Sequence, residues 1–239
     1  MKKIFKIISL LTFTFYLTFV YSNLSRAASH EPSSYINTIY AVNLCGPGSS
    51  LTACVGPVVL GSSTSGTTFD LGSVAAGASA GNMGNLSAAV SGTTYSFAQV
   101  ILSRAFTVTG EAAATGTRCR TETDNEFDAS SPSAVTGSND TAAAESQVIG
   151  IPSWTIPSNM IGTTSLTGLD GADNSSGNGN IADAEPRVKF RFALTAPITI
   201  VQGKLPTFTI SFDLSNALTF GGSCAATPSA PSVTASFSN

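Results

Sequence analysis

Histidine and charged residues are scarce in this 239-residue chain, which has one histidine and only 10% charged residues. The single imidazole, at His30, stands near the start of the chain, which argues against catalytic triads and metal sites built on histidine. After residue 27 the only lysines are Lys189 and Lys204, and neither follows a serine by three residues, so a serine-lysine dyad is not expected. These absences predict a protein that is not an enzyme.

Basic runs and phosphate-binding motifs are missing as well. The formal net charge is -3, which argues against a nucleic-acid partner. There is no Walker lysine, and Gly77, Gly81 and Gly84 have the wrong spacing for a dinucleotide-binding loop. Neither nucleic acid nor nucleotide is therefore predicted as a partner.

The first 27 residues have the features of an export signal. Lys2, Lys3 and Lys6 precede an apolar stretch of about 15 residues, which is shorter than a membrane-spanning helix. Small side chains at Ser25 and Ala27 predict cleavage after Ala27. Cleavage removes four of the 11 basic residues and none of the 14 acids, so the mature charge is 7 minus 14, or -7. We predict a secreted, periplasmic or cell-surface protein with a leader of the bacterial kind.

Four cysteines follow the leader, at Cys45, Cys54, Cys119 and Cys224. An even number of cysteines in an exported chain predicts disulfides, and three pairings are possible. The turn-forming residues 46–50 favour a bond between Cys45 and Cys54, which leaves Cys119 for Cys224. A zinc site is the alternative, although the short Cys-x-x-Cys pairs typical of such sites are missing.

The hydropathy pattern of the mature chain has a period of two, which is typical of strands. In the first strand, over 36–44, Ile36, Tyr40, Val42 and Leu44 are expected on one face and Asn37 with Asn43 on the other. A long segment, 95–108, is apolar on both sides and is expected to be central. Further strands are predicted over 187–194, 198–201, 208–214 and 233–237, with one short strand within 61–92. Only 86–90 and 142–147 could form a turn or two of helix.

Many short strands separated by Ser, Thr and Gly turns predict an all-β fold, an antiparallel β-sandwich with minor helix. We expect a signal peptide over 1–27 and a single domain over 28–239. The polar segment 110–186 is interpreted as a long insertion between core strands, with a separate subdomain as the alternative.

Acidic residues gather in two groups. Glu122, Asp124, Glu126 and Asp128 alternate along the chain, and we expect them to face solvent or to pair with Arg187, Lys189 and Arg191, which alternate on one face of the 187–194 strand. A cation site and a glycosidase-type acid pair are the alternatives for this group.

The second group is an oxygen-rich loop, for which Ca²⁺ is the one cofactor considered. Its candidate ligands are Asp170, Asp173, Asn174, Asn178, Asp183 and Glu185. The spacing does not match an EF-hand, and an exposed loop without a cation is the alternative reading.

Trp154, the only tryptophan, is a candidate contact for a sugar or a partner, although a core position is the simpler role. We expect a structural or adhesive protein of the cell surface, such as a filament or surface-layer subunit or an adhesin module, that assembles with itself or with other surface proteins. A strand donated from 36–44 or 233–237 could mediate this assembly. The alternatives are a glycan- or ligand-binding β-sandwich with a calcium-supported acidic loop, and an outer-membrane β-barrel.

Overall fold

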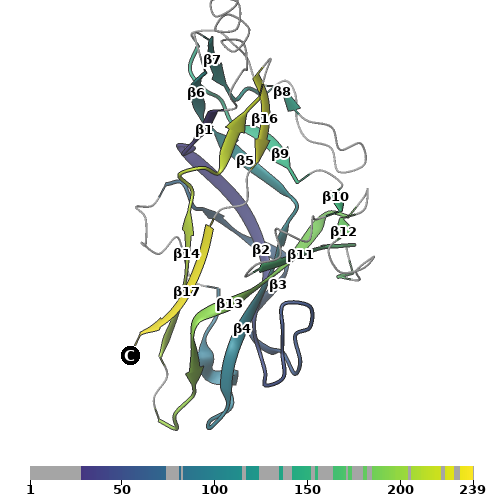
Figure 1. The fold of residues 1–239 in the computed structure, drawn as a ribbon, viewed down its shortest axis with the longest axis vertical. Coiled ribbons are helices and arrows are strands. Elements are labelled where there is room, and N and C mark those ends of the chain that lie inside the picture. Colours follow the sequence, from purple (N-terminus) through teal and green to yellow (C-terminus); the bar gives the residue numbers. More distant parts are fainter. Residues whose placement is uncertain are drawn as a thin grey trace, which may run out of the picture.

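The computed structural model of the chain is almost entirely β-structure (Figure 1). It describes residues 28–73, 81, 83–114, 117–123, 135–136, 142–151, 154–155, 164–170, 172–173, 180–181, 185–203, 206–221, 224–228 and 232–238. Every strand pair recorded among them is antiparallel. The predicted all-β class with antiparallel sheets and almost no helix is therefore confirmed. No helix in this part of the chain is long and apolar enough to cross a membrane.

The largest sheet in the described part of the chain has seven strands and is here called the main sheet. Its strands are β2 (Ser34–Cys45), β3 (Val58–Asp70), β4 (Thr94–Ser103), β5 (Ala105–Thr109), β9 (Gln147–Gly150), β11 (Thr164–Leu169) and β13 (Arg187–Thr199). One side of β2 pairs with β3, and the other side pairs with β4 and then β5. Next to these, β13 pairs with β4 and β9 pairs with β5, while β11 pairs with β13.

Smaller sheets accompany the main sheet. A four-stranded sheet contains, in spatial order, β1 (Ala28–His30), β15 (Leu218–Phe220), β16 (Ala225–Pro228) and β8 (Val135–Thr136). The two-stranded sheets are β14 (Thr207–Asp213) with β17 (Ser232–Ser238), β6 (Glu111–Ala114) with β7 (Thr117–Arg120), and β10 (Trp154–Thr155) with β12 (Asn180–Ile181). In Figure 1 the β1-β15-β16-β8 sheet lies near one end of the long axis, and β14 and β17 lie beside the other half of the molecule.

Two clusters of buried apolar side chains form the interior. The first core contains Val42, Leu44, Leu60, Leu86, Tyr95, Ala98, Val100, Phe192, Leu194 and Ile200, and Phe208, Ile210 and Phe237 of β14 and β17 pack against it. The second core contains Tyr35, Phe106, Val108, Ala112, Cys119, Ile149, Leu214, Ala217, Leu218, Phe220, Cys224 and Ala226. Leu102 of β4 packs against both clusters, so the main sheet links them.

Both predicted disulfides are present. Cys45 bonds to Cys54 across a short loop, and Cys119 bonds to Cys224, 105 positions further along the chain. The second bond joins β7 to the residue before β16, and both of its cysteines belong to the second core. No free thiol is left for the alternative zinc site, since these are the only four cysteines.

The predicted strand positions agree better with the structure than the predicted buried faces do. The central 95–108 segment is confirmed, although Arg104 divides it into β4 and β5. The predicted strands at 187–194 and 198–201 are one element, β13, with an irregular register between Ala193 and Ile198. The predicted strands near the C-terminus are confirmed as β14 and β17.

The expected single buried face of β2 is wrong. Tyr35 and Asn37 are buried in its first half, whereas every residue from Val42 to Cys45 is buried in its second half, where Val42 and Leu44 belong to the first core. The pairing register shifts between Ile39 and Ala41, and the extra residue of such a bulge changes which alternate positions face the interior. Because β2 also has partners on both edges, it is not positioned as a donated strand.

Two local predictions also need correction. The segment 142–147 is not helical: a bend at Ala142 is followed by residues without regular structure, and β9 begins at Gln147. In contrast, 86–90 does contain a 3-10 turn, η1 (Leu86–Ala88), in which the Asn85 side chain accepts a bond from the Ser87 amide. The short strand expected within 61–92 is instead the long β3, which starts before this segment at Val58.

Candidate functional site

A row of polar side chains crosses the main sheet on the face opposite the first core. Asn43 of β2 lies opposite Gln99 of β4, which lies opposite Arg191 of β13. All three side chains are buried, with Arg191 only 5% exposed. Alternation along each strand explains the row, since the immediate neighbours of these residues point into the first core.

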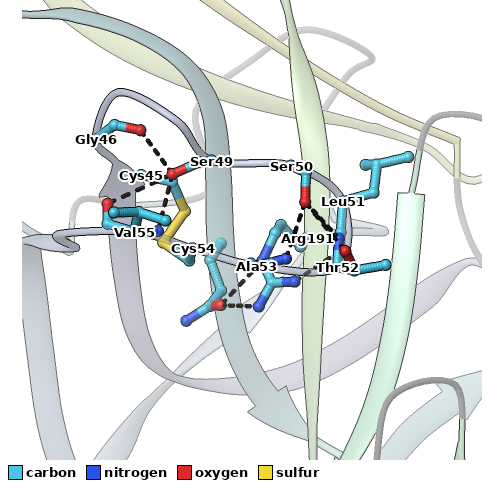
Figure 2. The surroundings of a disulfide bond; sticks show 11 residues. Cys45, Gly46, Ser49, Ser50, Leu51, Thr52, Ala53, Cys54, Val55 and Arg191 are labelled. Carbon is cyan, nitrogen blue, oxygen red and sulfur yellow. Dashed lines mark hydrogen bonds between the residues drawn. A yellow bond between two sulfur atoms is a disulfide. The ribbon is translucent and has the colours of Figure 1, made fainter.

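The Arg191 guanidinium is held by two groups from different elements (Figure 2). Its Nε and one Nη donate to Gln99 Oε1 at 3.3 and 2.8 Å, and the other Nη donates to the Leu51 carbonyl at 2.6 Å. Burial lowers the pKa of Arg191 from its ordinary value. Arg191 therefore lies beneath a loop, and its recorded hydrogen-bond partners are Gln99 and Leu51, not the acidic residues expected to pair with this strand face.

That loop is the segment closed by the Cys45–Cys54 disulfide. The Gly46 amide donates to the Val55 carbonyl at 2.8 Å, and the Ser49 hydroxyl donates to the Gly46 carbonyl at 2.6 Å. The Ser50 amide donates to the Ala53 carbonyl at 2.8 Å. The disulfide and these turn hydrogen bonds together hold the Leu51 carbonyl against the sheet. The sequence did not predict this contact, because Leu51 and Arg191 are about 140 positions apart.

The other two cations of this strand face have different surroundings. Arg187 pairs with Asp173 at 2.9 Å, and its guanidinium carbon lies 3.8 Å from the centre of the Tyr40 ring. Burial lowers the pKa of Lys189, as does the nearby charge of Arg191, while Asp173 opposes the shift. Three cationic side chains therefore lie on β13 in different surroundings: Arg187 pairs with a carboxylate, whereas Arg191 is held by neutral hydrogen-bond acceptors.

Of the first acidic group, only Glu122 belongs to the described residues, and its recorded ion pair is with a different arginine. Glu122 lies 3.9 Å from Arg120. Asp124, Glu126 and Asp128 lie outside the described residues.

The second acidic group is only partly described, because Asn174, Asn178 and Asp183 lie outside the described residues. Asp170 is exposed, and its carboxylate accepts a bond from the Ala172 amide at 2.8 Å. Asp173 has a positive φ of 64° and pairs with Arg187, whereas Glu185 is buried beside Gly168, where a larger residue would clash with its carboxylate.

No group of three metal-type side chains forms within the part of the chain that is described. Calcium binding by the whole loop stays a prediction. A chelator should lower the melting temperature if the loop binds Ca²⁺, and an unchanged melting temperature would contradict this.

Trp154 lies in β10, opposite Ile181 of β12. Its side chain is not among those that the structure describes, so the role of Trp154 as a contact for a sugar or a partner stays a prediction.

Sequence reasoning missed a second buried cation, Arg104, at the point where β4 becomes β5. Its side chain is fully buried, and it donates to the Ile151 carbonyl at 2.5 Å and to the Glu185 carbonyl at 3.2 Å. Nearby, the side-chain amide of Asn37 donates to the carbonyls of Ser103 and Ala105. These bonds satisfy backbone carbonyls at the junction of β4 and β5, just after β9 ends and just before β13 begins. The only signal for this site in the sequence is an isolated arginine within an apolar run.

The described part of the chain is therefore a set of antiparallel sheets that is cross-linked by two disulfides and by the hydrogen bonds of the buried side chains of Arg104 and Arg191. Its two disulfides point to an extracellular or otherwise oxidising environment. Comparisons with protein families, with curated proteins and with solved structures found no match. Its function must therefore be inferred from its own residues.

Proposed function

We propose that this protein is an exported structural or adhesive module of the cell surface, without catalytic activity. The observation that carries the proposal is the Cys119–Cys224 disulfide, which closes a loop of 105 positions within an all-β fold. Disulfides of this kind persist in oxidising compartments and favour a fold that survives outside the cell.

A two-layer β-sandwich is the proposed architecture of the module. Phe208, Ile210 and Phe237 bring β14 and β17 against the first core, while β15 brings Leu218 and Phe220 into the second core. The main sheet contributes to both cores, so it would be one layer and the smaller sheets the other.

The surface chemistry suits this role. The mature chain has few charged residues and a predicted net charge of -7. Two of its basic side chains, Arg104 and Arg191, are buried and do not contribute to the surface. An acidic, hydroxyl-rich exterior keeps an exported protein soluble without attracting nucleic acid.

Cell fractionation with an antibody against residues 28–239, combined with electron microscopy of the positive fraction, tests the proposal. We expect the protein in the surface or filament fraction, with Ala28 as its first residue on N-terminal sequencing. Recovery of the uncleaved chain from the cytosol alone would contradict it.

A further inference from the structure

The β14–β17 pair has one edge without a neighbouring strand in the described part of the chain. β14 pairs only with β17, over Thr207 to Asp213, and β17 also approaches β13. An edge of this kind presents backbone N–H and C=O groups with which a further strand can pair. Figure 1 shows this pair beside the main sheet, with the C-terminus at the end of β17.

This edge lacks the usual protection against pairing. Natural edge strands are commonly blocked by a lysine, a proline or an inward charge. β14 has the sequence Thr-Phe-Thr-Ile-Ser-Phe-Asp, in which Asp213 at the end is the only charge, and β17 has none. On a chain with a mature charge of -7, this strand pair is a place where two copies could meet with little repulsion.

The sequence of β14 is also close to symmetric about its centre. Ile210 is the midpoint, with hydroxyl side chains at Thr209 and Ser211 on either side and phenylalanine at Phe208 and Phe212 beyond them. An antiparallel two-fold pairing centred on Ile210 would therefore place like beside like.

We propose that β14 pairs with β14 of a second copy of this chain, antiparallel and centred on Ile210. Phe208 would then lie opposite Phe212 of the second copy, and Thr209 opposite Ser211. Aromatic pairs and hydroxyl pairs both stabilise facing strands. Asp213 would lie opposite Thr207, so the two aspartates would stand at opposite ends of the pairing.

The inner face of β14 supports the same occupant. Phe208 and Ile210 pack against the first core and Phe212 against the second, yet all three stay partly exposed. A second β14 would extend this face with the same residue types, joining two β14–β17 pairs into one four-stranded sheet. The inference rests on the proposed function and names its partner.

The test uses the mature chain and two double variants at positions that alternate with the core-facing residues. In Thr209→Lys with Ser211→Lys, the pairing would place lysine opposite lysine twice. In Thr209→Lys with Ser211→Glu, the same pairing would place lysine opposite glutamate twice, so this variant is the matched control. Sedimentation analysis over micromolar to millimolar concentrations measures association, and circular dichroism with thermal unfolding checks that each variant is folded.

We expect the wild-type chain to dimerise in a concentration-dependent way. The lysine-lysine variant should associate at least about tenfold more weakly, and the lysine-glutamate variant should recover the lost affinity. A wild-type chain that stays monomeric, a lysine-lysine variant that dimerises normally, or a folded lysine-glutamate variant that stays monomeric would each overturn the pairing. Localisation is measured separately, so a monomer found at the cell surface would refute this inference and leave the proposed function standing.

Discussion

A buried guanidinium is stable only if nearly all of its donors find acceptors, and Arg191 finds them on two separate elements. Gln99 comes from the neighbouring strand and Leu51 from the disulfide loop. The same side chain therefore links the loop to the sheet, and its removal would take these charged donors away from the Gln99 side chain and the Leu51 carbonyl.

Arg191→Met should lower the free energy of unfolding by about 2–3 kcal/mol, because the Gln99 side chain and the Leu51 carbonyl would lose charged hydrogen bonds. Urea unfolding of the oxidised protein measures the change. Lys189→Met is the control on the same strand face, and it should cost less than about 0.5 kcal/mol since its ammonium is half-buried and carries a lowered pKa. Equal effects of the two substitutions would contradict the role given to Arg191.

Tyr35 gives a pH prediction. Burial raises the pKa of its phenol well above the ordinary value of 10.0. Above pH 10 the unfolded chain loses this proton and the folded chain keeps it, so stability is complete below that pH and falls as the pH rises, by about 1.4 kcal/mol per pH unit.

Tyr35→Phe should therefore flatten the alkaline loss of stability. Urea midpoints between pH 9 and about 12 provide the measurement. An alkaline slope that is the same in the wild type and in Tyr35→Phe would count against the assignment.

For single residues, the sequence predicted the disulfide pairs correctly but did not predict the contacts of the buried arginines. The cysteine pairing followed from turn residues near Cys45, and a local signal was enough. The environments of Arg104 and Arg191 depend on contacts far apart in the chain, and alternation alone placed Arg191 on the same strand face as Arg187 and Lys189. Alternation reports the face of a strand and does not report what covers that face.

Among the elements, the two disulfides constrain the chain to different degrees. The Cys45–Cys54 bond spans nine positions and the Cys119–Cys224 bond spans 105. By loop entropy, removing the first should lower the free energy of unfolding by at most about 2.7 kcal/mol, and removing the second by at most about 5 kcal/mol.

Replacing each pair by serine and comparing urea midpoints tests this order. Cys119→Ser with Cys224→Ser should be the less stable variant, because it also removes two residues of the second core. Cys45→Ser with Cys54→Ser should additionally increase hydrogen exchange at residues 46–53, since the loop that holds Leu51 would be released. The reverse order of stability would contradict this account.

Element positions were the most predictable feature, because period-two alternation marks a half-buried strand directly. The details that failed have local physical causes. The bulge of β2 near Tyr40 exchanges its two faces, and β3 has so many Ser, Thr and Gly residues that its pairing with β2 leaves little hydrophobic signal. The candidate site could be predicted only as residue types, because composition and alternation carry no information about contacts such as that of Arg191 with Leu51, which are about 140 positions apart.

For the molecule as a whole, the main sheet links the two cores, and Leu102 touches both. We therefore expect residues 28–239 to unfold in a single cooperative transition. Far-UV circular dichroism and the fluorescence of Trp154, the only tryptophan, should give the same urea midpoint. Two separated midpoints would instead indicate that part of the chain, such as 110–186, is an independent subdomain.

The Cys119–Cys224 bond also determines how the protein would respond to mechanical load. A surface protein pulled from its two ends would transmit tension through this covalent link and bypass the 105 positions that it encloses. About 350 Å of contour length would stay hidden under force and become extensible only after reduction. Fluid shear on the cell could then stretch the two terminal segments while the enclosed portion kept its shape.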